Sequence, residues 1–259
     1  MRVSRSFHRL AAAAIATGVL LAAATTASAR TVVTIDGNVT PAITAFTLKP
    51  QILSLSLDLR FSSDVAGELP GTVARTTVFF PHGPRVNSAL FPSCNPQRLL
   101  RMRGSSRACP SGSRIGGGRA LGTSPSFEGV NERLTVDLYN GPRGRSILFY
   151  LRGLNPVAIS GMINASFTPL RGGRWGYKLA LRVPEGLQEI SPDILASLLQ
   201  FTTRVGGSVQ VRENGRTVRR GYIEVLACPP GALVPVRGVF GFRDGSSTTT
   251  DSYIACGHR

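Results

Sequence analysis

The segment Leu53–Phe61 reads LSLSLDLRF, and its pattern decides the fold class. Every second side chain is large and apolar, and those between them are polar. A two-residue period sends alternate side chains to opposite faces of a strand, so the segment predicts a sheet with one dry and one wet face. Residues 134–139 alternate in the same way. Residues 147–151, ILFYL, are apolar throughout, as in a strand covered on both faces.

Turn residues separate these strand-like segments. Asn214-Gly215 and Asp244-Gly245 each lie between two of them, and Asn and Gly tolerate the positive φ angles of tight hairpin turns. Short helices are expected at 96–102 and at 192–199, where Ser191 and Pro192 form a helix start. We therefore expect an all-β protein, a two-layer antiparallel β-sandwich with one or two short helices. Residues 30–259 would form a single domain, or two parts divided near residue 153.

The first 29 residues predict a signal peptide. Arg2, Arg5 and Arg9 precede an uncharged segment, 10–29, which ends in the small residues of Ala27–Ala29. An uncleaved membrane anchor is the alternative. No later segment is long and apolar enough to cross a membrane. The expected location is extracytoplasmic, either secreted or in a bacterial cell envelope.

The four cysteines predict structural disulfides. An exported chain meets an oxidising compartment, and four cysteines allow three connectivities. We favour Cys94 with Cys109 and Cys228 with Cys256, because both pairs are local. Zinc ribbons place their cysteines two to four residues apart, whereas these are more widely spaced, so neither a metal nor another cofactor is expected.

The cysteine segments resemble an uncharacterised family of secreted, β-sandwich-like proteins from high-GC actinobacteria. The similar blocks are 91–94 (FPSC), 108–120 (ACPSGSRIGGGRA), 228–231 (CPPG) and 240–245 (FGFRDG), with Tyr222 before Cys228 and with Cys256 near the end. The resemblance spans most of the chain after the leader. It implies export, a β-sandwich-like fold and two local disulfides, and it carries no assigned activity.

The residues that enzymes use are scarce, so we expect no catalytic site. After the leader the chain has only His82, in a turn, and His258, next to the last residue, and it has no G-x-S-x-G motif. An extracellular carbohydrate-active hydrolase or a sugar-binding module is the alternative function. A hydrolase would need two facing carboxylates, and the candidates are Glu128, Glu132, Asp137, Glu185, Glu189 and Asp193.

Positive charge is the strongest functional signal. The formal net charge is +16, carried almost entirely by arginine, and residues 69–127 and 138–184 contain no Asp or Glu. A genome rich in G and C would also favour Arg. Guanidinium groups suit phosphate and carboxylate partners. The sequence therefore predicts a non-catalytic structural or binding protein that contacts an anionic wall polymer or a lipid surface through Arg98, Arg101, Arg103, Arg107, Arg114 and Arg119.

Three further features are less specific. Nucleic acid is a disfavoured partner, because neither a recognition helix nor an aromatic platform is visible. Trp175 and Tyr177 are in register with Leu179 and are expected in the core. The glycines of segment 115–122 do not have phosphate-binding spacing and predict a bulge or a close approach of strands. The sequence makes no prediction of oligomeric state.

Overall fold

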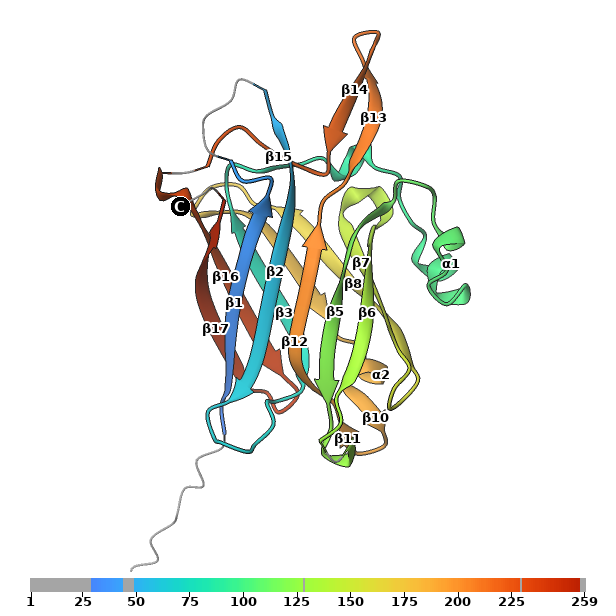
Figure 1. Ribbon diagram of the computed structural model, residues 1–259, viewed down its shortest axis with the longest axis vertical. Helices are drawn as coiled ribbons and strands as arrows, with labels where there is room; N and C mark the ends of the chain where they lie inside the picture. Colours follow the sequence, from blue (N-terminus) through green and yellow to red (C-terminus); the bar gives the residue numbers. More distant parts are fainter. Residues whose placement is uncertain (1–28, 44–48, 128, 229, 257–259) are drawn as a thin grey trace, which may run out of the picture.

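The computed structural model describes residues 29–43, 49–127, 129–228 and 230–256, most of which lie in strands (Figure 1). Residues 1–28, nearly all of the predicted signal peptide, lie outside the described residues, as does His258.

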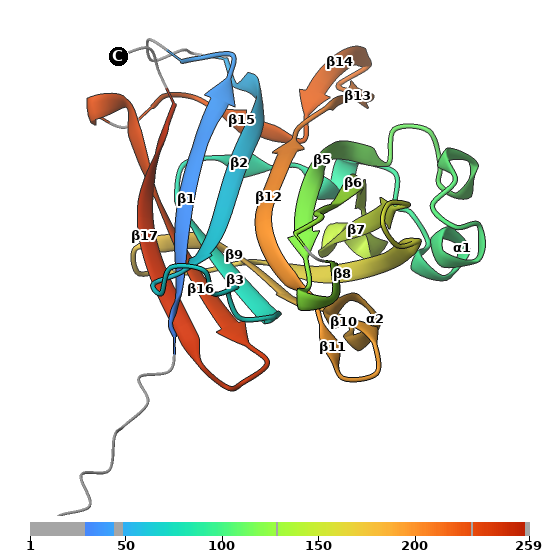
Figure 2. The ribbon, with the colours of Figure 1, turned by 60° about the horizontal axis from the view of Figure 1, so that its bottom comes forward.

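Eleven strands form a sheet that closes on itself (Figures 1 and 2). Around the barrel the order is β1-β17-β16-β3-β9-β8-β7-β6-β5-β12-β2, and β2 pairs back onto β1 over ten residues. All neighbours are antiparallel except β1 and β17, which are parallel. The strands are β1 (Thr31–Thr40), β2 (Gln51–Ser63), β3 (Val73–Pro81), β5 (Arg114–Thr123), β6 (Glu132–Asn140), β7 (Ser146–Gly153), β8 (Ile159–Pro169), β9 (Trp175–Arg182), β12 (Ser197–Val205), β16 (Leu233–Phe242) and β17 (Ser247–Ala255).

The predicted two-layer sandwich is therefore wrong, although the mostly β class and the few short helices are confirmed. The chain forms a mixed β-barrel. The alternation of apolar and polar side chains does not distinguish a sandwich from a barrel. Alternate residues face a dry interior both where two sheets stack and where one sheet closes on itself.

Side-chain hydroxyl groups close the seam between β1 and β17. Within the described parts of these two strands, only one residue pair, Asn38 with Ala255, is matched in the parallel register. Three hydroxyl groups of β17 donate instead to carbonyl oxygens of β1, over 2.7 Å, 2.7 Å and 2.5 Å. The pairs are Thr248 with Thr31, Thr250 with Val33, and Ser252 with Ile35. The seam thus explains why alternate positions of β17 are Thr and Ser rather than apolar residues.

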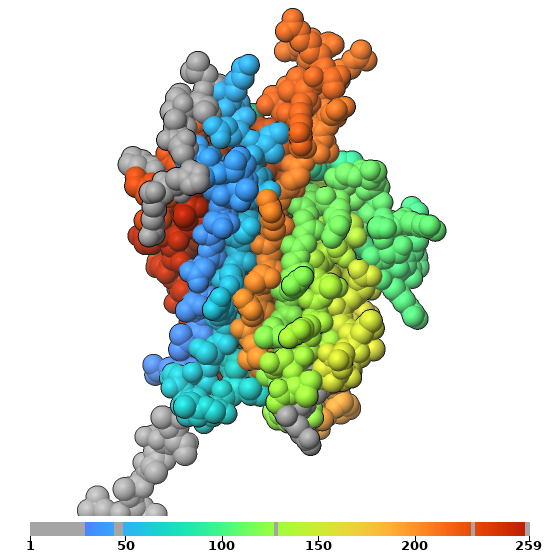
Figure 3. All heavy atoms as spheres, viewed as in Figure 1, coloured from blue at the N-terminus to red at the C-terminus, as the bar shows by residue number. Residues whose placement is uncertain are grey.

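Short elements lie at the ends of the barrel and, in the case of α1 (Pro96–Arg101), against its outer wall. Asn214 and Gly215 both have positive φ and form the predicted hairpin turn, which projects from one end (Figure 3). The helix expected at 192–199 is wrong, because Asp193 has φ +66° and turns the chain into a small hairpin. The other short elements are β4 (Arg85–Val86), α2 (Glu185–Gln188), β10 (Glu189–Ser191), β11 (Ile194–Leu195), β13 (Ser208–Glu213), β14 (Arg216–Gly221), β15 (Ile223–Val225) and 3₁₀ helices at Ser88–Leu90, Ser106–Ala108, Pro125–Phe127, Pro142–Gly144 and Pro230–Ala232.

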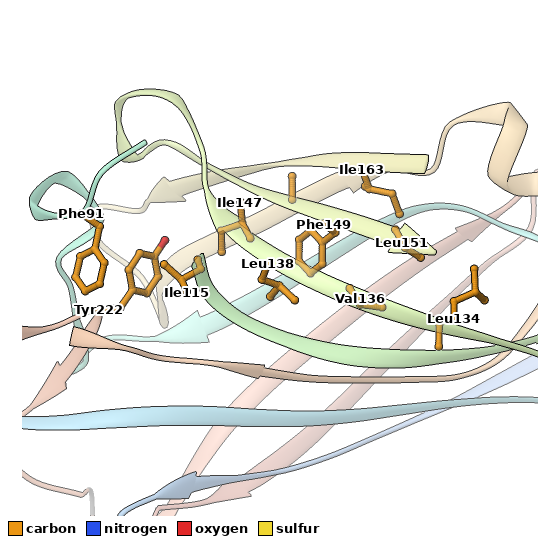
Figure 4. Close-up of a cluster of buried hydrophobic side chains, with 12 residues drawn as sticks. Phe91, Ile115, Leu134, Val136, Leu138, Ile147, Phe149, Leu151, Ile163 and Tyr222 are labelled. Atoms are coloured by element: carbon orange, nitrogen blue, oxygen red, sulfur yellow. The ribbon is translucent and has the colours of Figure 1, made fainter. Parts of the chain in front are cut away.

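Two apolar clusters fill much of the interior. One lines β5 to β8 and includes Leu138 and Phe149 (Figure 4), and the other lines β1, β2, β3, β16 and β17 around Phe240. Phe201 on β12 and Leu198 pack against both clusters. The two clusters therefore meet across the barrel, where they form a continuous core.

A third cluster lies outside the barrel wall and explains the fully apolar segment 147–151. The disulfide loop, defined as residues 94–109 between Cys94 and Cys109, packs Leu99 against Leu148 and Tyr150 on the outer face of β7. Gly104, with φ +72°, lies so close to the Tyr150 ring that a Cβ would collide with it. The prediction of a strand covered on both faces is confirmed.

The glycines of segment 115–122 permit a close approach of strands. A Cβ on Gly116 or Gly118 would collide with the carbonyl oxygen of Arg204 or Thr202 on β12, respectively. The pairing of β5 with β6 also shifts register between Arg114 and Gly116. The predicted bulge and close packing are both present.

Candidate ligand-binding site

An interior cavity of about 470 Å³ occupies one end of the barrel, beneath β15. The strands β1, β2, β3, β7, β9, β12 and β16 each contribute inward-facing residues to it. Leu55 and Leu57 show the consequence: they point inward on the apolar face of β2, yet remain partly exposed, whereas Leu59 and Phe61 further along the strand are buried. The interior is packed at one end and hollow at the other.

The cavity wall is almost wholly apolar. Among the described residues that line it there is no Asp, Glu, Lys or Arg. Phe167 and Tyr177 stack at 5.2 Å between ring centroids, and aliphatic residues such as Val205 and Leu179 supply much of the remaining surface. Such a wall offers dispersion contacts and few partners for the hydrogen bonds of water.

The polar atoms of Tyr222 are engaged elsewhere. Its hydroxyl donates to Asn140 Oδ1 over 3.4 Å, and burial raises the pKa of the phenol. Asn140 Nδ2 in turn donates to the carbonyl oxygens of Ser88 and Phe91. Figure 4 shows Tyr222 beside Phe91 at one end of the cluster. This buried network fixes the segment before the disulfide loop and leaves the Tyr222 ring to line the cavity.

The second disulfide borders the cavity. Cys228, which follows β15, is joined to Cys256, which follows β17, and both line the wall. The Ile43 amide donates to the Cys256 carbonyl over 2.8 Å, so the segment after β1 is held at the same place. Both cysteine pairs expected from the sequence are thus joined, and the two disulfides suggest an oxidising, extracytoplasmic environment.

His82 lies exposed at the edge of the cavity. Its Nε2 is 3.2 Å from the Gly173 carbonyl, between two turns, and neither a Ser nor a Cys is among its bonded partners. The described residues contain no group of three or more His, Cys, Asp or Glu side chains that could hold a metal ion.

The candidate carboxylates are mostly engaged in holding the fold. Buried Glu132 accepts from the amides of Asn155 and Val157 and so fixes the β7–β8 connection. Asp137 bonds Arg114 and Arg152, and Glu189 is paired with Arg243. Glu185 begins α2, Asp193 lies in the turn between β10 and β11, and Glu128 is outside the described residues.

The six arginines of the predicted anion surface do not form a single cluster. Arg98, Arg101, Arg103 and Arg107 are exposed on the disulfide loop, and Arg114 and Arg119 are on the outer face of β5. Arg103 alone joins two arginines that the sequence had not singled out, Arg133 and Arg152, in lining an outer groove.

Trp175 departs from its expected place in the core. The pairing of β3 with β9 skips Gly176, so Tyr177 faces inward whereas Trp175 packs outside with Phe79, at 6.0 Å between ring centroids, and under Arg237. A bulge of one residue reverses the face of every side chain beyond it. Tyr177 therefore has the expected inward direction, but it is only partly buried and lines the cavity instead of joining an apolar cluster, and the prediction is wrong for Trp175.

Sequence reasoning identified the inward-facing residues but missed the cavity. The alternation identified Leu55 and Leu57 on β2, and Leu179 on β9, as members of the apolar face of their strands. A local pattern does not indicate whether side chains from opposite strands meet across the interior or leave a cavity between them. That depends on the number of strands in the barrel, which follows from long-range pairing.

Comparison with protein-family models gave no match, and neither curated proteins nor solved structures gave one. The family resemblance of the cysteine segments therefore stays a prediction. Among the described residues no helix has both the length and the apolar character that spanning a bilayer requires.

Proposed function

We propose that this chain is an exported, non-catalytic binding protein that takes one elongated apolar molecule, such as an acyl chain, into the interior cavity of its barrel. The observation that carries the proposal is the hollow, uncharged end of the barrel, about 470 Å³ in volume. Cavities of roughly 300–1,000 Å³ are the usual size for small-molecule sites. The basic, apolar leader and the two disulfides support a place in a bacterial envelope or outside the cell.

The physical driving force is the burial of apolar surface. A ligand that buries about 400 Å² gains about 10 kcal/mol at about 25 cal/mol per Å². Association costs at least about 4 kcal/mol, which leaves at most about 6 kcal/mol, so the expected dissociation constant is about 40 μM or weaker. Because the wall carries no charge, the ligand's head group would remain at the open edge near His82, and its chain length would determine affinity.

The test is a titration of the protein with N-phenyl-1-naphthylamine, whose fluorescence rises in apolar surroundings, followed by displacement with fatty acids of increasing length. Val205→Trp fills the cavity from β12 and is expected to weaken binding at least tenfold. Leu154→Trp is the matched control, because Leu154 is 84% exposed and lies outside the barrel.

Circular dichroism and thermal unfolding establish that both variants fold. A second cavity variant, Phe80→Ala, enlarges the site and should shift the preferred fatty acid to a longer chain. Equal binding by the wild type and by folded Val205→Trp would remove the proposal, as would displacement that does not depend on chain length.

A further inference from the structure

The outer face of β5 to β8 carries basic and polar side chains in register. Thr135 on β6 lies between Arg119 on β5 and Arg152 on β7. Arg152 in turn is paired with Ser160 on β8. Arg133 precedes Thr135 by two residues on the same face, so it is a diagonal neighbour of Arg152, about 7–8 Å away between Cα atoms. Two guanidinium groups therefore emerge side by side from the barrel wall.

The disulfide loop forms the opposite wall of a concave site. Its packing on Leu148 and Tyr150 holds it against the outer face of β7, and Figures 1 and 2 show the loop with α1 standing beside β6 to β8. Arg103 precedes Gly104, which touches the Tyr150 ring, and this brings Arg103 to the same site. The resulting outer groove has a volume of about 960 Å³. Its polar lining includes Arg103, Arg133, Arg152, Asn131, Asn155 and Ser160.

The positive charge of the groove is only partly neutralised within the protein. None of the described residues that line the groove is acidic. Asp137 follows Thr135 by two residues on the same face of β6. One of its carboxylate oxygens is paired with Arg114 at 2.6 Å and the other with Arg152 at 3.1 Å. Within the described chain no carboxylate pairs with Arg103 or Arg133. The groove is thus lined by two guanidinium groups without a carboxylate partner among the described residues, those of Arg103 and Arg133, and by that of Arg152, which is paired with Asp137.

We propose that the outer groove binds an anionic polysaccharide, with a carboxylate or phosphate group held by Arg103, Arg133 and Arg152. Asn131, Asn155 and Ser160 offer hydrogen bonds to ring hydroxyls, while Leu121 and Ile159 offer apolar contact to the carbon face of a sugar. This site is separate from the interior cavity and does not depend on a ligand there.

The shape and composition of the groove favour a glycan over other anions. A concave groove accepts a chain, whereas a flat bilayer surface would meet only the projecting parts of its two walls. Single-stranded nucleic acid needs exposed aromatic rings on which bases stack. Among the described residues that line the groove Tyr150 alone is aromatic, and it is 2% exposed. Membranes and nucleic acid are therefore the comparison arms of the test.

The test measures binding to polygalacturonate, a carboxylated glycan, by calorimetry at low salt. Neutral dextran, phosphatidylglycerol vesicles and oligodeoxythymidine are the comparison probes. The variant Arg103→Gln/Arg133→Gln removes two groove charges that make no internal ion pair. Its control, Arg212→Gln/Arg216→Gln, removes two exposed charges from the β13–β14 hairpin and matches the change in net charge.

We expect the groove variant to bind polygalacturonate at least tenfold more weakly and the hairpin variant to stay within twofold of the wild type. Addition of salt should weaken the binding of polygalacturonate by the wild type, because salt screens the charges. Equal losses in the two variants would show that net charge alone acts and would overturn the proposal. Dextran binding as tight as polygalacturonate binding, or tighter binding of vesicles or oligonucleotide, would also overturn it.

Discussion

Removing the three hydroxyl groups at the β1–β17 seam should open the weakest join of the barrel. The triple variant Thr248→Val, Thr250→Val, Ser252→Ala deletes the donors to three β1 carbonyl oxygens, and a single matched pair in the parallel register would remain. Each hydrogen bond contributes about 0.5–1.5 kcal/mol net, so the unfolding free energy should fall by about 2–4 kcal/mol. For a domain of this size, that corresponds to a fall in Tm of roughly 5–15 °C.

The assay is denaturant unfolding of the oxidised protein, followed by circular dichroism and by the fluorescence of Trp175, the only tryptophan. Thr249→Val is the matched control, because Thr249 is exposed, points away from the seam and has no side-chain bond to β1. If the triple variant and the control unfold within about 0.5 kcal/mol of one another, the hydroxyl groups do not hold the seam and this reasoning is refuted.

Three further perturbations follow from named contacts. Replacing Cys94 and Cys109 with Ser should lower the free energy of unfolding by about 3 kcal/mol, because the disulfide no longer restricts the unfolded chain. Proteolysis within 94–109 should also accelerate, and an unchanged cleavage rate would contradict a tethered loop. Gly118→Ala places a Cβ against the Thr202 carbonyl oxygen and should lower the denaturant midpoint clearly more than Gly186→Ala, at an open position; equal midpoints would contradict close strand packing. The hydrogen bond from Arg237 lowers the pKa of Asp251 below its ordinary 3.8. The pair therefore stabilises the protein above that pH and loses its effect as the pH falls through the lowered pKa. The stability difference between wild type and Asp251→Asn should accordingly be present at pH 6, small because the pair is exposed, and should shrink toward pH 2; a constant difference would contradict this assignment.

The sequence allowed prediction of those structural features that residues close together in the chain determine. The alternation of Leu53–Phe61 gave a strand with one dry face, Asn214-Gly215 gave a hairpin, and the local cysteine pairs gave the disulfides. Each of these depends on side-chain period, turn geometry or a short loop.

Features that depend on distant pairing were missed. Closure of the barrel requires β1 to meet β17, more than 200 residues later, and the Thr and Ser residues that make this contact look merely polar in the sequence. The bulge at Gly176 moved Trp175 outside, and the positive φ of Asp193 replaced an expected helix with a turn. In the outer groove, Arg133 and Arg152 become neighbours only through the register of β6 and β7.

A crystal structure grown with 12-bromododecanoic acid tests the central claim most directly, because bromine gives an anomalous signal that locates the chain of the ligand. A closed barrel with a bromine peak among Phe149, Leu179 and Val205 is the predicted result. A barrel open between β1 and β17, or a peak found solely on the outer surface while the interior is filled by side chains, would contradict it.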